Sequence, residues 1–183
     1  DVAGLSLVGT GNPGLKPERG QEVEAGFEVD LLDGRLGLDF TWFRQTTKDA
    51  IVGKRLAPST GYSGPLFTNI GEITNRGVEL GLSYVVLNTR AQRWDWRLNV
   101  STAKGEITDL DEPIIFGLGG DSQRHEEGHP HASYFSRTYT IDESGDAVAS
   151  DSAVFVGHPT PELEGSISTS LQLFGWVTLS AHL

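Results

Sequence analysis

Short and long connections alternate along this chain, and the segments between them alternate apolar with polar residues. Two connections are tight, at residues 31–35 and 174–176, and a third, at residues 88–90, is short. Two long polar stretches lie between them, at about residues 46–75 and 104–161. A β-barrel that crosses an outer membrane has short turns on the periplasmic side and long loops outside. The pattern therefore predicts an all-β fold: an antiparallel up-and-down transmembrane barrel segment of about six strands, not closed alone.

Six segments of about ten residues, the length that a tilted strand needs to cross a bilayer, carry the alternation. Their apolar faces are Val23, Ala25, Phe27, Val29 and Leu31; Leu36, Leu38, Phe40 and Trp42; Val78, Leu80, Leu82, Tyr84 and Val86; Trp94, Trp96, Leu98 and Val100; Leu163, Ile167, Thr169, Leu171 and Leu173; and Val177, Leu179, Ala181 and Leu183. No charged residue interrupts the middle of these faces, where Arg or Lys against lipid costs about 2–4 kcal/mol. Aromatic residues lie toward several segment ends, as in interfacial aromatic belts.

A soluble β-sandwich or barrel acting as a carbohydrate-binding module is the alternative, because a period of two does not distinguish a lipid face from a core face. The polar face favours a wet lumen, since it is rich in Glu, Ser and Gly. Its acidic residues are Glu22, Glu24, Glu28, Asp30 and Glu79. The unequal loop lengths at the two ends also favour the membrane.

Composition excludes several classes of function. The net charge is −11 and no Lys/Arg cluster occurs, so the chain does not resemble a nucleic-acid binder. There is no cysteine, and therefore neither a disulfide framework nor a thiolate metal site. No apolar run approaches the length of a transmembrane helix. The sequence starts without a signal segment and stops at Leu183 within a strand pattern, so we expect an internal part of a longer protein.

Two short motifs suggest ligands but fit structural roles better. Residues 9–14 match the dinucleotide-binding string G-x-G-x-x-G, which requires a helix to begin at its glycines. Pro13 and Pro17 oppose that helix, so we expect a glycine-rich loop. Asp142-Glu143-Ser144-Gly145-Asp146 lacks the ligand order of a calcium loop, and we expect a hairpin turn within residues 139–148.

Three histidines, His125, His129 and His131, gather with two carboxylates in residues 125–131. Gly128 and Pro130 prevent a helical zinc-binding face, so a solvated loop without a structural metal is the prediction. Residues 99–101 form a glycosylation sequon by letter only, since they lie within a predicted strand. No nucleophile and base form a local catalytic signature. We therefore expect no enzyme activity, no catalytic residues and no cofactor.

Four stretches resemble TonB-dependent outer-membrane receptors. Asn12-Pro13-Gly14-Leu15-Lys16-Pro17-Glu18 resembles the N-P-x-L-K-P-E string that precedes a barrel strand in that family. Residues 34–43 are similar to the next strand. Residues 69–80 resemble N-x-G-E-I-x-N-x-G-[VI]-E-L, and residues 157–165 resemble G-x-P-x-P-x-[FL]-x-G of the SusC/RagA-like branch. The chain is thereby identified as a member of this family, within its C-terminal β-barrel.

The resemblance implies a plugged barrel of about 22 strands in the cell outer membrane. It also implies import of a large nutrient of the glycan, peptide or siderophore class. The expected partners are membrane lipid, the TonB complex acting through a plug domain absent from residues 1–183, and a SusD-like surface lipoprotein. The substrate-binding residues are not indicated. Residues 104–161 are expected outside the cell, where a tag near Gly120 should be accessible.

Overall fold

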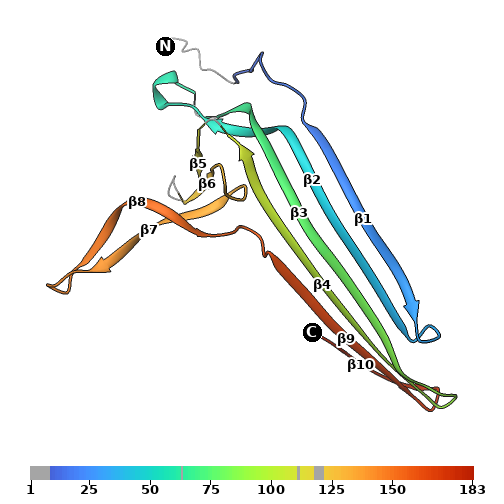
Figure 1. Cartoon of the computed structure of the whole chain (residues 1–183). Helices are drawn as coiled ribbons and strands as arrows, with labels where there is room; N and C mark the ends of the chain where they lie inside the picture. The colour runs from blue at the N-terminus through green and yellow to red at the C-terminus, as the bar shows by residue number, and fades with distance from the viewer. Residues whose placement is uncertain (1–8, 63, 111, 118–121) are drawn as a thin grey trace, which may run out of the picture. The chain divides into compact units, whose positions relative to one another are not determined.

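The computed structural model describes residues 9–62, 64–110, 112–117 and 122–183. These residues form an all-β fold with one sheet of six strands and one of four, shown in Figure 1. The helical element among them is a single short 3-10 turn, η1 (Pro58–Thr60). Within these same ranges, no helix is long and apolar enough to span a membrane.

The six-stranded sheet confirms the predicted set of strands. Its members are β1 (Arg19–Leu31), β2 (Leu36–Arg55), β3 (Pro65–Asn88), β4 (Gln92–Asp109), β9 (Leu163–Leu173) and β10 (Val177–His182). They lie in the order β1-β2-β3-β4-β9-β10, so each strand neighbours the next strand of this set along the chain. β9 pairs antiparallel with both β4 and β10. The sheet is open, with β1 and β10 at its two edges, as expected for part of a larger barrel.

The tight turns lie where the sequence predicts them, but the first one is longer than expected. A two-residue turn at Asp33-Gly34 requires positive φ at those two positions only. Leu32, Asp33 and Gly34 have φ of 55°, 56° and 75°, and the Arg35 N–H donates to the Leu32 carbonyl over 3.2 Å. Strand pairing therefore ends at Leu31 and Leu36, and the turn contains four residues. Phe174 also adopts a positive φ, of 55°, in the turn between β9 and β10.

Three strands are about twice as long as the apolar alternation predicts. β2, β3 and β4 contain 20, 24 and 18 residues, so most of the predicted excursion at residues 46–75 is strand. Thr, Ile and Val in these extensions favour extended backbone. The extensions carry no continuous apolar stripe, which is the signal that the prediction used. The expectation of a long loop at residues 46–75 is therefore wrong, and only residues 56–64 lie between β2 and β3.

The chain divides into two compact units. The sheet unit contains residues 22–45, 75–104 and 160–183, and the loop unit contains residues 1–21, 46–74 and 105–159. The core of the loop unit is small: Ala50, Ile70 and Ile114 are buried, with Val52, Ile73 and Leu110 packed against them. The second sheet, also in the loop unit, has the order β5-β6-β7-β8 and comprises β5 (Ile114–Phe116), β6 (Gln123–His125), β7 (Ser133–Ile141) and β8 (Ala147–Gly157).

The predicted hairpin within residues 139–148 is confirmed. β7 and β8 pair antiparallel, with Ile141 opposite Ala147. The Asp142 carboxylate accepts hydrogen bonds of 2.9 Å from the backbone N–H groups of Ser144 and Asp146. Gly145 adopts a φ of 88°, which a glycine tolerates without steric cost. The Asp142 carboxylate therefore caps the predicted hairpin turn.

Residues 9–14 form a loop that leads into β1, so the glycine-rich reading is confirmed. The Asn12 side chain accepts a hydrogen bond of 3.0 Å from the Gly14 N–H. Its amide group donates to the Phe67 carbonyl over 3.0 Å. Because a strand follows this loop, no helix N-terminus is available for a pyrophosphate.

Two of the family-like motifs bind one another in the loop unit. The Asn69 side chain donates to the carbonyls of Lys16 and Asp49 over 2.8 and 2.6 Å, and accepts from the Lys16 N–H over 2.8 Å. The Glu18 carboxylate accepts a short hydrogen bond from the Ile51 N–H. We call this contact the Asn69 clamp; it attaches the segment before β1 to β2 and β3.

Candidate functional site

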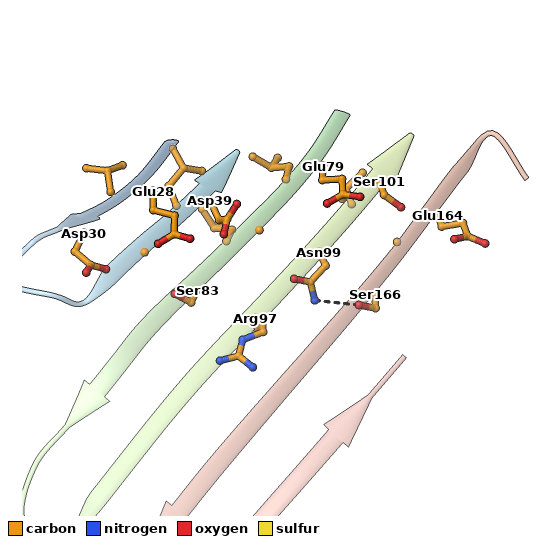
Figure 2. Close-up of a pocket in the computed structure, with 18 residues that line it drawn as sticks. Glu28, Asp30, Asp39, Glu79, Ser83, Arg97, Asn99, Ser101, Glu164 and Ser166 are labelled. Atoms are coloured by element: carbon orange, nitrogen blue, oxygen red, sulfur yellow. Dashed lines mark hydrogen bonds between the residues drawn. The ribbon is translucent and has the colours of Figure 1, made fainter. Parts of the chain in front are cut away.

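One face of the sheet unit forms a polar groove of about 930 Å³. Five strands supply its side chains. Those labelled in Figure 2 are Glu28, Asp30, Asp39, Glu79, Ser83, Arg97, Asn99, Ser101, Glu164 and Ser166. In each strand these residues follow a period of two, so they occupy one face.

Glycine contacts verify which residues share this face. A Cβ built on Gly37 would lie 2.5 Å from the Ser83 hydroxyl and 3.3 Å from an oxygen of Asp30. A Cβ on Gly81 would lie 3.3 Å from the Asp39 Cβ. The carboxylates and hydroxyls thus project over glycines of neighbouring strands. Two glycines therefore leave room for the polar side chains of the groove.

The groove is acidic. Five carboxylates line it, from Glu28, Asp30, Asp39, Glu79 and Glu164, while Arg97 is the cation among the lining residues. Glu28, Asp30 and Glu79 were predicted on this face; Glu22 and Glu24 lie on β1 but do not line the groove. The Asn99 amide donates to the Ser166 hydroxyl over 3.3 Å, so the sequon asparagine lies within a strand as expected.

The opposite face of the sheet unit is apolar and uncovered. Phe27 stacks on Phe40 with ring centroids 5.4 Å apart, yet Phe27 remains 53% exposed. Leu179 of β10 is 57% exposed. The Trp94 indole N–H donates to the Thr169 hydroxyl over 2.9 Å, so its polar edge is satisfied while its ring stays on this face. We call this face the outward face.

The prediction of a solvated loop holds for only part of the histidine segment: residues 126–132 form a loop in which His131 is exposed, whereas His125 and His129 are half-buried against aromatic rings. The His129 ring stacks on Phe155 at 4.8 Å and meets the edge of Phe135 at 5.4 Å. The His125 ring lies 4.7 Å from the Phe116 ring. These phenylalanines come from β5, β7 and β8, so the local sequence around the histidines gives no signal of the contact.

Burial favours the neutral form of His125. Desolvation lowers its pKa below the usual 6.5, and the nearby His131 lowers it further. The Nδ1 atom of His125 accepts a hydrogen bond of 3.2 Å from the Ala132 N–H, which requires the unprotonated nitrogen. Among the described residues, no group of three or more His, Asp or Glu could hold a metal ion. The absence of a structural metal stays a prediction.

Apolar residues of the long stretch at 104–161 divide between core and surface. Ile114 and Phe135 are each 5% exposed and pack within the loop unit. Ile115 and Tyr134 are 43% and 44% exposed. The distal half of the β7–β8 hairpin is more open still, with Tyr139 72% and Ile141 65% exposed.

An open antiparallel sheet with one polar, grooved face and one exposed apolar face defines the class of membrane β-barrel walls. A family model described as TonB dependent receptor-like, beta-barrel matches residues 3–181. The chain belongs to this family. Its members are transporters and receptors of the outer membrane and are not enzymes.

Individual relatives agree. The chain is 27% identical to TonB-dependent receptor P3 of Formosa agariphila over 75% of its residues, and 25% identical to TonB-dependent receptor SusC of Bacteroides thetaiotaomicron over 73%. It spans only 14% and 15% of the lengths of these relatives. The RagAB peptide transporter has the same fold, with a TM-score of 0.82 at 21% identity over 100% of this chain and 22% of that one.

Proposed function

We propose that this chain is part of the barrel wall of an outer-membrane importer of a large nutrient, driven through TonB. The observation that carries the proposal is the segregation of the sheet unit into an acidic grooved face and an apolar face. Soluble proteins rarely leave so large an apolar surface uncovered. A bilayer would cover the outward face, and the groove would face the lumen.

In this arrangement the groove contacts the plug domain, which lies outside residues 1–183. The five carboxylates of the groove favour a plug surface that carries Lys and Arg. The wall itself performs no chemistry. Its role is to hold the plug and to enclose the path of the substrate.

The substrate class rests on the relatives. Solved structures of the same fold include the RagAB peptide transporter, and a curated relative is SusC. We propose a nutrient too large to diffuse through general pores, of the peptide class named for RagAB or of the glycan or siderophore class that the sequence resemblance also implies. A SusD-like surface lipoprotein is the proposed partner, and the exposed side chains Tyr139 and Ile141 on the β7–β8 hairpin supply a contact surface for it or for the substrate.

Two arginine substitutions in the full-length protein test the membrane assignment. Leu80 lies in the apolar stripe of β3, whereas the Ser83 hydroxyl lies on the polar face, 2.5 Å from a Cβ built on Gly37. Leu80→Arg should reduce the amount of folded barrel in the outer membrane severely, because a cation near the midplane costs about 2–4 kcal/mol. Ser83→Arg, with the same charge in a wet lumen, should assemble nearly normally. Equal assembly of both variants would contradict the proposed function.

Topology and transport need separate measurements. The Asp142–Asp146 turn is exposed, so a tag inserted at Ser144 should react with an impermeant reagent on whole cells. Gly120, where the sequence suggested a tag, lies outside the described residues. Deletion of the gene should abolish growth on one nutrient class among peptides, glycans and siderophore-bound iron. Labelling of Ser144 only after disruption of the outer membrane would reverse the assigned topology.

The alternative of a soluble carbohydrate-binding module gains no specific support. A β-sandwich covers the apolar face of each sheet with the other sheet. Among the described residues, the sheet unit consists of a single open sheet. Recovery of the full-length protein in the soluble fraction would restore this alternative.

A further inference from the structure

Three cations form a row on the outward face of the sheet unit, one from each of three neighbouring strands. They are Arg44 of β2, Arg76 of β3 and Lys104 of β4. We propose that this basic row binds the phosphate groups of lipid head groups in the outer leaflet. The inference rests on the proposed function, since it requires the outward face to lie against lipid.

Glycine contacts establish the row between β2 and β3. A Cβ on Gly81 would meet Asp39, and a Cβ on Gly77 would lie 2.7 Å from the Phe43 ring. From Gly81 to Gly77 the chain moves four positions back along β3, and from Asp39 to Phe43 it moves four positions forward along β2. The two strands therefore pair antiparallel with a constant register. Arg76 precedes Gly77 and Arg44 follows Phe43. The two arginines therefore lie opposite one another, on the face that Gly77 and Phe43 do not occupy.

The same offset places Lys104 beside Arg76. A Cβ on Gly81 would lie 3.8 Å from the Asn99 side chain, and one on Gly71, ten positions earlier, would lie 2.5 Å from the side chain of Asp109, ten positions after Asn99. Five positions before Gly81 is Arg76, and five positions after Asn99 is Lys104. Odd steps move both residues to the outward face.

Within the part of the chain that the structure describes, the row has no ion-pair partner. All three side chains are exposed, and none of the ion pairs in the described ranges includes Arg44, Arg76 or Lys104. Like charges directly opposite one another across two strands destabilise a sheet. An anion between them removes that repulsion. Two guanidinium groups and one ammonium group match phosphate oxygens, which guanidinium groups bind through paired hydrogen bonds.

The height of the row matches a head-group layer. Each cation lies just beyond the end of an apolar stripe: Arg44 is two positions from Trp42 and Arg76 two positions from Val78. Lys104 is four positions from Val100, with Thr102 between them. On β3 the stripe is Val78, Leu80, Leu82, Tyr84 and Val86, and it ends at Asn88. Twelve residues separate Arg76 from Asn88, or about 40 Å along a strand. A tilt of about 40° reduces this to about 30 Å, the thickness of a hydrocarbon core. If Asn88 lies at one interface, Arg76 lies at the other, on the side away from the short turns.

The test uses the full-length protein in detergent, titrated with phosphatidylglycerol or phosphatidylcholine and analysed by native mass spectrometry. The variant is R44Q/R76Q/K104Q. Each basic residue near an anionic surface contributes a few-fold, so we expect a loss of phosphatidylglycerol affinity of about 100-fold for the three charges together. Inorganic phosphate added at equal concentration should not displace the lipid, because the site includes the apolar stripe below the row.

A matched control, R55Q/R90Q/R137Q, removes three exposed arginines that are outside the row. It should retain the parental affinity, and R44K/R76K should retain most of it. Equal lipid affinity of the parent and the row variant would overturn the inference while leaving the importer assignment intact. Heat-modifiable migration in gels reports barrel folding separately: failure of the parent itself to fold in membranes would refute the proposed function, and the inference with it.

Discussion

Asn69 shows how one side chain can explain two separated sequence motifs. Its amide contacts Lys16, 53 positions earlier in the chain, and Asp49, 20 positions earlier. Asp49 has a φ of 55°, unusual for a residue in a strand, and its carbonyl points to the Asn69 amide. The two family-like strings thus fit together physically, which the sequence alone does not reveal.

Replacement of Asn69 should release the segment before β1. Asn69→Ala removes three hydrogen bonds, each contributing about 1 kcal/mol, so local opening of residues 12–18 should become easier by about 2–3 kcal/mol. Hydrogen exchange of this segment in the full-length barrel measures the effect. Asn75→Ala is the matched control, because Asn75 lies on the same strand and its side chain forms no hydrogen bond with the described residues. Equal protection in the two variants would show that the clamp contributes nothing.

The His125 environment predicts acid sensitivity of the loop unit. Its pKa is lowered in the folded state, by burial first and by His131 second, so the unfolded chain binds the proton more readily. The stabilising contribution is therefore complete above about pH 6.5 and is lost as the pH falls from there through the folded pKa. Protonation of Nδ1 also removes the acceptor for the Ala132 N–H.

Limited proteolysis within residues 122–158 between pH 7.5 and 5 measures this loss. His125→Asn should flatten the pH dependence, since its amide does not titrate in this range. His131→Asn should flatten it only partly, because the charge of His131 is the smaller cause. A variant at position 125 with the parental pH profile would contradict the assignment.

At the scale of elements, strand pairing depends on close approach as much as on alternation. Gly77 has no space for a side chain: a Cβ there would collide with the Thr102 carbonyl and lie 2.7 Å from the Phe43 ring. Phe43 covers this glycine from the neighbouring strand on the polar face. The motif glycine therefore permits an aromatic residue to lie across the backbone of β3.

Substitution of this glycine should disturb the sheet more than substitution of another strand glycine. Gly77→Ala forces a shift of backbone or ring, with a cost of about 1–3 kcal/mol for overpacking. Gly20→Ala in β1 meets nothing within 4 Å and should be nearly neutral. The thermal midpoint of the refolded full-length barrel in detergent compares the two. Equal thermal midpoints of the two variants would mean that β3 and its neighbours accommodate the added methyl group without a loss of stability.

At the scale of the whole molecule, very little surface is buried. Ala50, Ile70, Ile107, Ile114 and Phe135 are the buried hydrophobic residues among those described. Six strands are fewer than the eight of the smallest barrels, so the sheet has two open edges. Open edges and an uncovered apolar face both promote association between chains.

Residues 1–183 expressed alone should therefore aggregate in water or require detergent. Size-exclusion chromatography and thermal melting monitored by circular dichroism provide the measurement. The full-length barrel in detergent serves as the positive control. A monodisperse soluble monomer with a cooperative melt would contradict this expectation and favour the soluble alternative.

The sequence by itself determined the six strands, their order, the positions of the turns and the segregation of the two faces. These follow from local rules, because alternation has a period of two and Asp33-Gly34 favours positive φ. The lengths of β2 and β3 could not be predicted from local sequence. Their extensions lack an apolar stripe and are held by pairing with neighbouring strands. The hairpin turn at residues 142–146 was predicted correctly because it is local: the Asp142 carboxylate bonds to N–H groups only two and four residues away.

Only the tertiary structure decided contacts between residues distant in sequence. His125 and His129 lie against rings from three strands, and the Asn69 clamp spans 53 positions. The groove forms because the register of five strands brings its polar side chains together, and the basic row forms through the register of three strands. A period of two assigns each side chain to a face of the sheet, but it does not say which residue of the neighbouring strand lies opposite. The register of the strands decides which residues lie opposite, and this register is fixed by packing between strands.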